Sequence, residues 1–464
     1  MKPTAPLRDG VGVALAGFAL RAGVSLWAAG RFPPSEDGRF YHVLASRMAA
    51  GEGYSWLWPD GVVTPVAHYP VGYAALLAAV YSVFGVAPWL AMAVNSIIGG
   101  VGVLAAHRIA ARGASRLGAL LGAGLVAAHP ALVFYTPAVM TEGIAASVLA
   151  VIAWSCLRMA RARRPLVWAL AVGVLFGAFV LMRPQMLLLA PVFAVFGAPS
   201  MKAALLRAAL VTTMAVACVL PWTYRNCTSM DRCAFVSANG GWNLWIGAPP
   251  HATGTFLSVA GDTVPEQCRS VFPEVAKDVC FARAARHNIA RAPGAWIRLI
   301  PKKLAHTFDY CGAAGWYLHA ANPAAFDSSA KLTLGVVETT YQRVLLMLGL
   351  LSFAGPGPRR RLRRLLVGAG SLALLTPLGW LGYLTLGIVA PIARRPRPLL
   401  SSSPAYFAWA AVAMTALTHA VFFGAGRYGM VTFVVLGALS GSLLTAKAEP
   451  GDTASQENST DALD

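Results

Sequence analysis

Asp37 is the residue whose type and position best suit chemistry. It comes directly before a segment in which one face recurs at helical spacing, with Tyr41, Leu44, Ala45 and Met48. A carboxylate at that place can cap the helix by accepting backbone N–H bonds, or it can accept a proton as a general base. From these residues alone the capping role is the stronger expectation, and catalysis is the alternative.

A second acid, Glu142, stands where an apolar run begins. It can lie close to Asp37, either as a second acidic group or as a joint ligand of a divalent cation. It can equally be an acid of the first helical turn, where the helix dipole favours negative charge. We hold these roles as equal alternatives. Arg183 stands at another helix end. We expect its long side chain to reach toward the membrane surface, which accounts for a charged residue at this position.

These residues require membrane helices to position them. The sequence is 57% hydrophobic and only 12% charged, with a mean hydropathy of +0.59, whereas a typical soluble domain is about 25% charged. A soluble fold of this length could not cover so much apolar surface, so lipid must be the solvent for most of it. The composition therefore predicts an all-α polytopic membrane protein, a bundle of about 10–12 transmembrane helices.

Apolar runs give the expected spans. They cover residues 11–29, 88–111, 117–135, 139–159, 166–181, 185–196, 203–222, 332–353, 405–423 and 430–444, with two short helices in 365–390 that turn at 376–379. The run 70–84 is too short to cross a core of about 30 Å, so we expect it along the outer surface or part-way in. With a short helix at 40–50 it forms a first outer loop, residues 30–86.

Basic residues set the orientation. The net charge of +19 is concentrated in clusters between apolar runs, at 108–116, 158–164, 359–364 and 394–397. This positive-inside pattern predicts a bacterial inner-membrane protein in contact with membrane lipids, with an uncleaved first span and both termini in the cytoplasm. A polar tail at 446–464 is expected to be disordered. Nucleic-acid binding is excluded, because no basic segment is interleaved with stacking aromatic residues.

The expected organisation is a transmembrane module at 1–222, an exported segment at 223–330 and further transmembrane helices at 331–445. Five of the seven cysteines lie in the exported segment, where an oxidising compartment favours disulfides over a metal. Four cysteines allow three pairings, of which Cys227–Cys233 and Cys268–Cys280 are the simplest. In the same segment Trp242 and Trp245 can stack on a sugar or pack in a turn. The stretch 293–308 is amphipathic and is expected to lie on the lipid surface.

Several motifs occur in one order along the chain: Asp37-x3-Tyr41-x3-Ala45, Gly51-x-Gly53, Tyr69-Pro70-Val71-Gly72-Tyr73, Glu142, Pro221-Trp222-x2-Arg225-Asn226, Asn239 to Gly247, and Arg427-Tyr428. Together they resemble the GT-C superfamily of membrane glycosyltransferases. The resemblance is greatest to bacterial relatives of protein O-mannosyltransferases and of lipid A aminoarabinose transferases, which are similar to glycosyltransferase family 39. It extends from about residue 11 to residue 445. The aminoarabinose transferases have a Glu-Lys pair where this chain has His68-Tyr69, so the resemblance does not specify the sugar.

The resemblance implies an inverting hexosyl or pentosyl transferase. Such an enzyme takes a sugar from a polyprenyl-phosphate donor and passes it to a lipid, glycan or protein acceptor outside the membrane. Phosphate is already a good leaving group, so one base is enough, and Asp37 is the expected catalytic residue. The expected substrate-binding residues are Glu142, His68, Tyr69, Arg225, Arg427, Tyr428 and Trp245. Among them Arg427, Arg225 and His68 would hold the phosphate. No cofactor is implied beyond a possible divalent cation at Asp37 and Glu142.

Two other classes of membrane protein compete with this interpretation. A transporter would favour internal repeats and charged residues near the midplane, whereas the ionisable residues here cluster at the ends of spans. An O-antigen ligase or polysaccharide polymerase also uses lipid-linked sugars, but its catalytic groups would be expected in a late outer loop. Substitution of Asp37, in the first outer loop, distinguishes both alternatives from the transferase.

Overall fold

The structure, a computed structural model, describes residues 5–355, 359–392 and 405–444. Within these ranges, six helices are long and apolar enough to cross a membrane. They are α1 (Ala5–Ala28), α4 (Pro88–Ala110), α7 (Glu142–Met159), α8 (Pro165–Met182), α10 (Met201–Ser229) and α16 (Ser328–Leu351). Shorter apolar helices pack with them: α3 (Val71–Phe84), α5 (Arg116–Ala127), η1 with α9 (Pro184–Ala194), α18 (Trp380–Ile392) and α19 (Ala405–Val421). The predicted all-α polytopic membrane fold is confirmed.

The other elements are short. In the first outer loop they are α2 (Asp37–Ala49) and an antiparallel hairpin of β1 (Ser55–Leu57) and β2 (Val63–Pro65). Later elements are α6 (Pro130–Phe134), α11 (Gly240–Ile246), α12 (Glu274–Arg291), α13 (Pro293–Arg298), α14 (Ile300–Phe308), α15 (Ala313–Ala321), α17 (Arg360–Leu374), α20 (Gly426–Gly429) and α21 (Phe433–Ser440). Single 3-10 turns lie at Gly261–Thr263, Glu266–Cys268, Ser352–Ala354, Met430–Thr432 and Gly441–Leu443.

Small residues let the long helices pack closely. Helices α8 and α10 are the clearest case, since Gly173 faces Met214 and Gly177 faces Cys218 one turn along. A Cβ on Gly173 would lie 2.6 Å from the Cβ of Met214, so a larger residue would separate the helices. Such small-residue contacts replace the hydrophobic driving force that is missing between helices in lipid.

The predicted spans differ from the observed helices in a few places. The run 117–135 is interrupted: α5 ends at Ala127, and His129 takes an extended conformation before Pro130 begins α6. A residue before proline is disfavoured in the helical region, which accounts for the break. The predicted turn near 376–379 is confirmed, because α17 ends at Leu374 and α18 begins at Trp380. The basic cluster 394–397 and the tail 446–464 lie outside the described residues.

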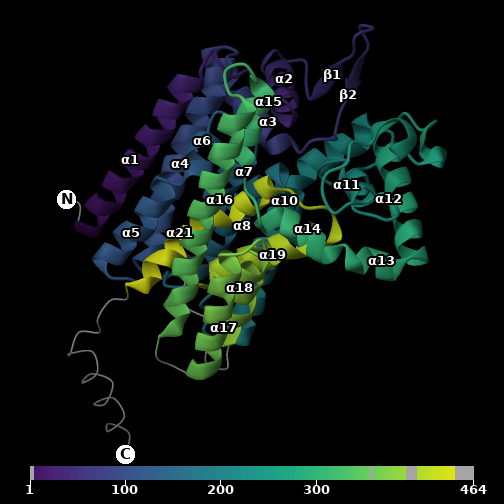
Figure 1. Cartoon of the computed structure of the whole chain (residues 1–464). Helices are drawn as coiled ribbons and strands as arrows, with labels where there is room; N and C mark the ends of the chain where they lie inside the picture. Colours follow the sequence, from purple (N-terminus) through teal and green to yellow (C-terminus); the bar gives the residue numbers. More distant parts are fainter. Residues whose placement is uncertain (1–4, 356–358, 393–404, 445–464) are drawn as a thin grey trace, which may run out of the picture.

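The helix bundle has two ends. At one end Arg116, at the start of α5, pairs with Asp9 of α1 at 2.6 Å, and Ser115 N–H donates to the carbonyl of Leu444. At the other end the amide of Asn322 donates to the carbonyl of Arg31, just beyond α1, and α2 follows directly. We call these the Arg116 end and the Asp37 end. In Figure 1, α1, α4 and α5 lie at one side of the bundle, and α17 and α18 lie at the bottom.

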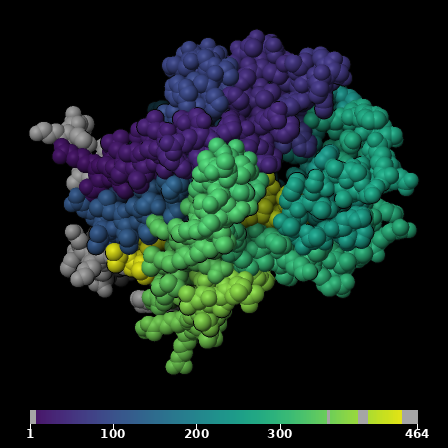
Figure 2. All heavy atoms as spheres, turned by 45° about the horizontal axis from the view of Figure 1, so that its top comes forward, coloured from purple at the N-terminus to yellow at the C-terminus, as the bar shows by residue number. Residues whose placement is uncertain are grey.

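Segment 223–330 forms a lobe beside the Asp37 end. Figure 2 shows its teal atoms as a distinct mass next to the purple atoms of the first outer loop. The two parts are hydrogen-bonded, since Ala238 N–H donates to the carbonyl of Ala67. The structure contains the disulfides Cys227–Cys233 and Cys268–Cys280, the two pairs that the spacing favoured.

The prediction that segment 293–308 lies on the lipid surface is wrong at Lys303. The segment is two helices, α13 and α14, and Lys303 is fully buried instead of facing lipid. Its ammonium donates to the carbonyls of Ala420 and Val421 at the end of α19, and it lies 5.2 Å from the ring centre of Trp296. Helix α14 therefore ties the lobe to the bundle next to α20.

Candidate active site

Asp37 lies at the first residue of α2, but it does not cap the helix. Glu36 occupies the capping position, and no side chain there accepts a backbone bond. The carboxylate of Asp37 instead accepts a hydrogen bond from the hydroxyl of Tyr69 at 2.9 Å and pairs with Arg427 Nη2 at 3.0 Å. Because Asp37 stands one residue past the N-cap and its carboxylate contacts side chains instead, the capping role is wrong. The Asp37 side chain is 33% exposed, so a substrate can reach it.

Glu142 is the second acid of the cluster, and its side chain is only 4% exposed. It begins α7, as the helix-dipole argument expected, and one of its oxygens lies 2.7 Å from Arg183 Nη2. The same oxygen lies 3.8 Å from Arg427 Nε, and the other accepts from the hydroxyl of Tyr135 at 3.1 Å. The guanidinium of Arg427 thus bridges the two acids that the sequence placed in one site.

The position of Arg427 depends on its neighbours in the sequence and on aromatic rings. A Cβ at Gly426 would clash with the carbonyl oxygens of Tyr310 and Cys311, so only glycine fits directly before it. The guanidinium lies 5.6 Å from the ring centre of Trp316 and 5.2 Å from that of Tyr428. Such cation–π contacts favour a charge that is withdrawn from water.

Tyr428 forms the outer support of this arginine. Its ring stacks on the imidazole of His419 with the centroids 4.4 Å apart and the planes 9° from parallel. His419 is held in turn by a hydrogen bond between its Nδ1 and the carbonyl of Phe423. Tyr428 therefore lies in the cluster, as the sequence predicted, in contact with Arg427 and not with a carboxylate.

Arg183 belongs to the cluster, and the expectation that it reaches toward the surface is wrong. It is buried, and its Nη2 also donates to the hydroxyl of Thr141 at 3.0 Å. It stands at the end of α8 in an extended conformation because Pro184 follows it. The sequence signal was available: an arginine directly before a proline at the end of an apolar run cannot continue the helix, and its side chain can turn into the bundle.

Tyr69 joins the acidic cluster to a groove. Its ring stacks on Phe40 with the centroids 5.2 Å apart, and Phe40 lies 4.9 Å from Trp56. Burial, and then the charge of Asp37, raise the pKa of the Tyr69 phenol, so it stays a hydrogen-bond donor. The groove, of about 710 Å³, lies between the first outer loop and segment 223–330. Its aromatic lining residues are Phe40, Trp56, Trp58, Tyr69, Trp242 and Phe272.

His68 also lines this groove, with its ring edge-on to Trp242 at 5.6 Å. Burial lowers the pKa of the imidazole, more than nearby carboxylates raise it. His68 is thus neutral near pH 7, and it can donate a hydrogen bond to a phosphate but not a full charge. Its backbone N–H and that of Ala67 both donate to the carboxylate of Glu274, the first residue of α12.

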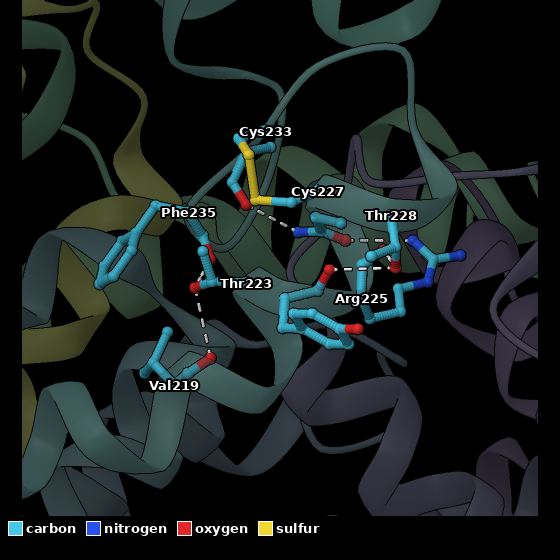
Figure 3. The surroundings of a disulfide bond; sticks show 10 residues. Val219, Thr223, Arg225, Cys227, Thr228, Cys233 and Phe235 are labelled. Atoms are coloured by element: carbon cyan, nitrogen blue, oxygen red, sulfur yellow. Dashed lines mark hydrogen bonds between the residues drawn. A yellow bond between two sulfur atoms is a disulfide. The ribbon is translucent and has the colours of Figure 1, made fainter.

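Arg225 lies at the back of the first outer loop and holds its backbone. Its guanidinium donates to the carbonyls of Val66 and Tyr54 at 2.8 and 2.7 Å. Figure 3 shows the surroundings: the Cys227–Cys233 disulfide follows Arg225, and the hydroxyl of Thr223 donates to the carbonyl of Phe235. The end of α10 is thereby fixed against the returning chain, and Arg225 is fixed with it.

Trp245 lies in the core of the lobe. Its side chain packs in a small apolar cluster with Phe281 and Cys268, and its indole N–H donates to the carbonyl of Thr263 at 2.9 Å. Of the two tryptophans considered for sugar stacking, Trp242 lines the groove and Trp245 does not appear among its lining residues. The structure thus brings together Asp37, Glu142, Tyr69, Arg427 and Tyr428, with His68 nearby, while Arg225 and Trp245 take positions in the frame.

The acidic pair does not fit a divalent cation. Both carboxylates accept from arginine, and Arg427 occupies the position between them. Among the residues that the structure describes, no group of three or more His, Cys, Asp or Glu side chains could hold a metal ion. The carboxylate oxygens that a cation would need already accept from arginine and tyrosine donors. We therefore derive no chemical step through a metal at Asp37 and Glu142.

Fold and site together define a multi-pass membrane protein with a charged cluster at one end of its helix bundle. Residues 68–224 match the family model of the dolichyl-phosphate-mannose-protein mannosyltransferases. This segment contains Tyr69, Glu142 and Arg225, and the match confirms the resemblance to GT-C glycosyltransferases that the motifs predicted. No curated protein matches the chain.

The solved structures that match the chain include those of two proteins. One is the archaeal oligosaccharyltransferase AglB from Archaeoglobus fulgidus, in complex with an inhibitory peptide and a dolichol-phosphate, at 14% identity and a TM-score of 0.44. The match covers 97% of this chain and 54% of that one, so this chain spans about half its length. The other is ArnT from Cupriavidus metallidurans bound to undecaprenyl phosphate, at 14% identity and a TM-score of 0.40, covering 94% of this chain and 77% of that one.

Proposed function

We propose that this protein is an inverting membrane glycosyltransferase that moves a sugar from a polyprenyl-phosphate donor to an acceptor hydroxyl. The observation that carries the proposal is the position of the Asp37 carboxylate. It accepts a hydrogen bond from Tyr69, pairs with Arg427 and is part-exposed. Tyr69 also lines the aromatic groove, so the carboxylate lies close to that groove. The family match over residues 68–224 supports the same chemistry.

In the proposed reaction one carboxylate is sufficient. The acceptor oxygen attacks the anomeric carbon, and the bond from that carbon to the phosphate oxygen breaks with its electron pair going to the phosphate. Asp37 takes the proton from the acceptor hydroxyl. A glycosidase must also protonate an alkoxide leaving group and so requires a second carboxyl group as an acid. A phosphate leaving group needs no such acid. Glu142, bound to Arg183 and Tyr135, can therefore serve to hold the guanidinium groups of the arginines in place.

Arg427 is the proposed phosphate ligand. Its guanidinium is neutralised by Asp37 at 3.0 Å, with Glu142 at 3.8 Å. A donor phosphate that binds the planar guanidinium competes with Asp37 for the same N–H groups. Binding of the donor would thus loosen the ion pair and release the carboxylate to act as a base. Glu142 and Arg183 act as positioning residues, because neither needs to touch the substrate.

The aromatic groove is the proposed place of the acceptor. Phe40, Trp56 and Trp58 line it, and Tyr69, which also lines it, donates its hydroxyl to Asp37. Flat apolar faces suit the C–H faces of sugar rings, and the polar groups of His68, Asp231 and Lys277 line the same space. We therefore expect an acceptor that carries a sugar or another flat polar group.

Arg225 and Trp245 support the site at a distance in this proposal. Arg225 holds the backbone on either side of the hairpin, and Glu274 holds Ala67 and His68 from the lobe. Together they fix the segment that carries Tyr69. The proposed orientation places the Asp37 end on the outer face of a bacterial inner membrane and both termini in the cytoplasm, following the basic residues of the Arg116 end.

Mass spectrometry of lipid-linked sugars and envelope glycans tests the function, in cells with the wild-type protein, without it, and with the Asp37→Asn variant. The proposal expects one polyprenyl-phosphate sugar to accumulate and one glycan to lose a residue in the second and third cases. Unchanged sugars and glycans in cells that lack the protein would contradict it. If the Asp37→Asn variant restored the sugars and glycans of the deletion strain as fully as the wild-type protein does, the protein would still act in the envelope, but Asp37 would not take part in the chemistry.

A further inference from the structure

Four arginines converge on a cavity at the Arg116 end of the bundle, away from Asp37. The cavity has a volume of about 560 Å³ and is lined by Arg108, Arg112, Arg158 and Arg161, together with Leu104, Ala111 and Trp154. Arg108 lies in the last turn of α4 and Arg158 in the last turn of α7, while the other two lie in the turns that follow these helices. A second space of about 320 Å³ is lined by three of the same arginines and reaches Trp168 of α8.

Tryptophans frame the cavity. The guanidinium carbon of Arg158 lies 5.9 Å from the ring centre of Trp154 and 5.4 Å from that of Trp168. An arginine between two indole rings loses freedom to turn into water, and the rings attract its charge. Arg158 is therefore held at the wall of the cavity, so the convergence of charge is built into the packing of α7 and α8.

The positive charge of this cavity is not balanced by acids. Within the described ranges none of the four arginines takes part in an ion pair, and Asp9 at the same end is paired with Arg116. The Nε of Arg108 is buried without a hydrogen-bond partner. Burial, and then repulsion from Arg161, Arg158 and Arg108, lower the pKa of Arg112. Like charges that line one space repel one another, and an anion between them relieves this repulsion.

Membrane orientation explains why arginines occur at this end but not why four of them face one space. Arg163 and Arg164 lie with Arg161 in the connection between α7 and α8 and are exposed, yet neither lines either cavity. As positive charges at this end of the bundle, Arg163 and Arg164 would orient the protein in a membrane equally well. The convergence of the other four thus points to a ligand.

We propose that Arg108, Arg112, Arg158 and Arg161 form a binding site for an anion whose phosphate offers at least two unesterified oxygens. Arginine forks match phosphate oxygens, and basic pockets between membrane helices suit anionic headgroups. The anion is either the headgroup of a membrane lipid or a soluble phosphate compound; the shared chemistry is the phosphate. The site is separate from the transfer chemistry and does not depend on the proposed function.

Two probes distinguish the sources, applied to the purified full chain in neutral detergent. Inorganic pyrophosphate is titrated by calorimetry, and native mass spectrometry counts phosphatidylglycerol carried over from vesicles of phosphatidylglycerol and phosphatidylcholine. The Arg112→Ala/Arg158→Ala/Arg161→Ala variant is expected to lose about tenfold or more in affinity for the probe that binds. Pyrophosphate binding would identify a soluble ligand, and selective retention of phosphatidylglycerol would identify a lipid.

The matched control removes the same charge from the same end without lining the cavity: Arg163→Ala/Arg164→Ala/Lys202→Ala, all exposed. It should bind as the wild type does. The proposal is overturned if neither probe binds the wild-type protein, if the cavity variant binds as well as the wild type, or if the control loses as much affinity as the cavity variant. Retained thermal unfolding temperatures confirm that both variants are folded.

Discussion

Arg427, near the end of the chain, lies 3.0 Å from the carboxylate of Asp37, near its beginning. The two residues form this ion pair because α2 and α20 lie next to each other at one end of the bundle. The Arg427 side chain is 18% exposed against 33% for Asp37, so water and substrate approach from the side of the acid. Asp37 is thus the more accessible member of the pair, as its proposed role as a base requires.

The first prediction concerns Asp37→Asn. Asparagine keeps the shape and can still accept from Tyr69, but it cannot take a proton. We expect the rate of sugar transfer to fall about 10²-fold or more, with protein of normal yield in the membrane. Asp37→Glu should recover little activity, because the longer side chain moves the oxygen. The assay is transfer from a polyprenyl-phosphate sugar by protein in liposomes.

Glu36→Gln is the matched control, because Glu36 is the exposed neighbouring acid. It removes the same charge one residue away and should leave the rate near that of the wild type. Equal losses in both variants would mean that net charge at the loop matters and not a base. Transfer by folded Asp37→Asn at a normal rate would exclude Asp37, and Glu142 would be tested next.

A second prediction concerns Arg427→Lys and Arg427→Gln. Lysine keeps a charge but lacks the planar fork, so we expect the KM for the donor to rise about tenfold, and more for glutamine. Binding of polyprenyl phosphate, measured by native mass spectrometry, should weaken in the same order. The exposed Arg39→Gln of α2 serves as the control. An unchanged KM in Arg427→Gln would remove this residue from phosphate binding.

A third prediction uses the buried pair of Glu142 and Arg183, which lie 2.7 Å apart and are 4% and 9% exposed. Glu142→Gln leaves the charge of Arg183 buried without its ion-pair partner and should cost about 3–5 kcal/mol of stability. Arg183→Gln should cost less, because Glu142 keeps Arg427 at 3.8 Å. The double variant should cost much less than the sum, because no lone charge remains. Thermal unfolding in detergent measures this coupling. Additive losses would show that the two side chains do not act as a pair.

The sequence could predict much of this cluster because three of its members are marked by their immediate neighbours in the sequence. Asp37 precedes a helix, Glu142 begins a span, and Arg427 follows a glycine that the packing requires. Arg183 was misjudged since the reach of an arginine at a helix end depends on what faces it, and here that is Glu142 from another helix. The burial of Trp245, the backbone contacts of Arg225 and the break at His129 likewise depend on partners or on local strain that residue type alone does not reveal.

A fourth prediction concerns the disulfides. Three cysteines are free in the described structure, Cys156, Cys218 and Cys311, and the other four are paired. Denatured but unreduced protein should therefore take up alkylating reagent at these three positions only, as read by peptide mass spectrometry. Cys227→Ser/Cys233→Ser should lower stability by up to about 2–3 kcal/mol and reduce activity, because it loosens the end of α10 that holds Arg225. Alkylation of all the cysteines without reduction would contradict the pairing.

The last prediction is a pH dependence at Lys303. Burial lowers the pKa of its ammonium to about 8 from the usual 10.5. Between these two pH values the unfolded state binds more protons than the folded state, so the stability of the wild-type protein rises with pH through this group. Below about pH 8 the lysine is charged in both states and adds no slope. Lys303→Met cannot titrate, so the stability of the wild type relative to this variant should increase by up to about 3 kcal/mol from pH 8 to 10.5. The comparison is made by thermal unfolding in detergent, with the exposed Lys302→Met as the control that follows the wild type. A difference between wild type and Lys303→Met that stays constant over this range would show that Lys303 is not held in a desolvated position against α19.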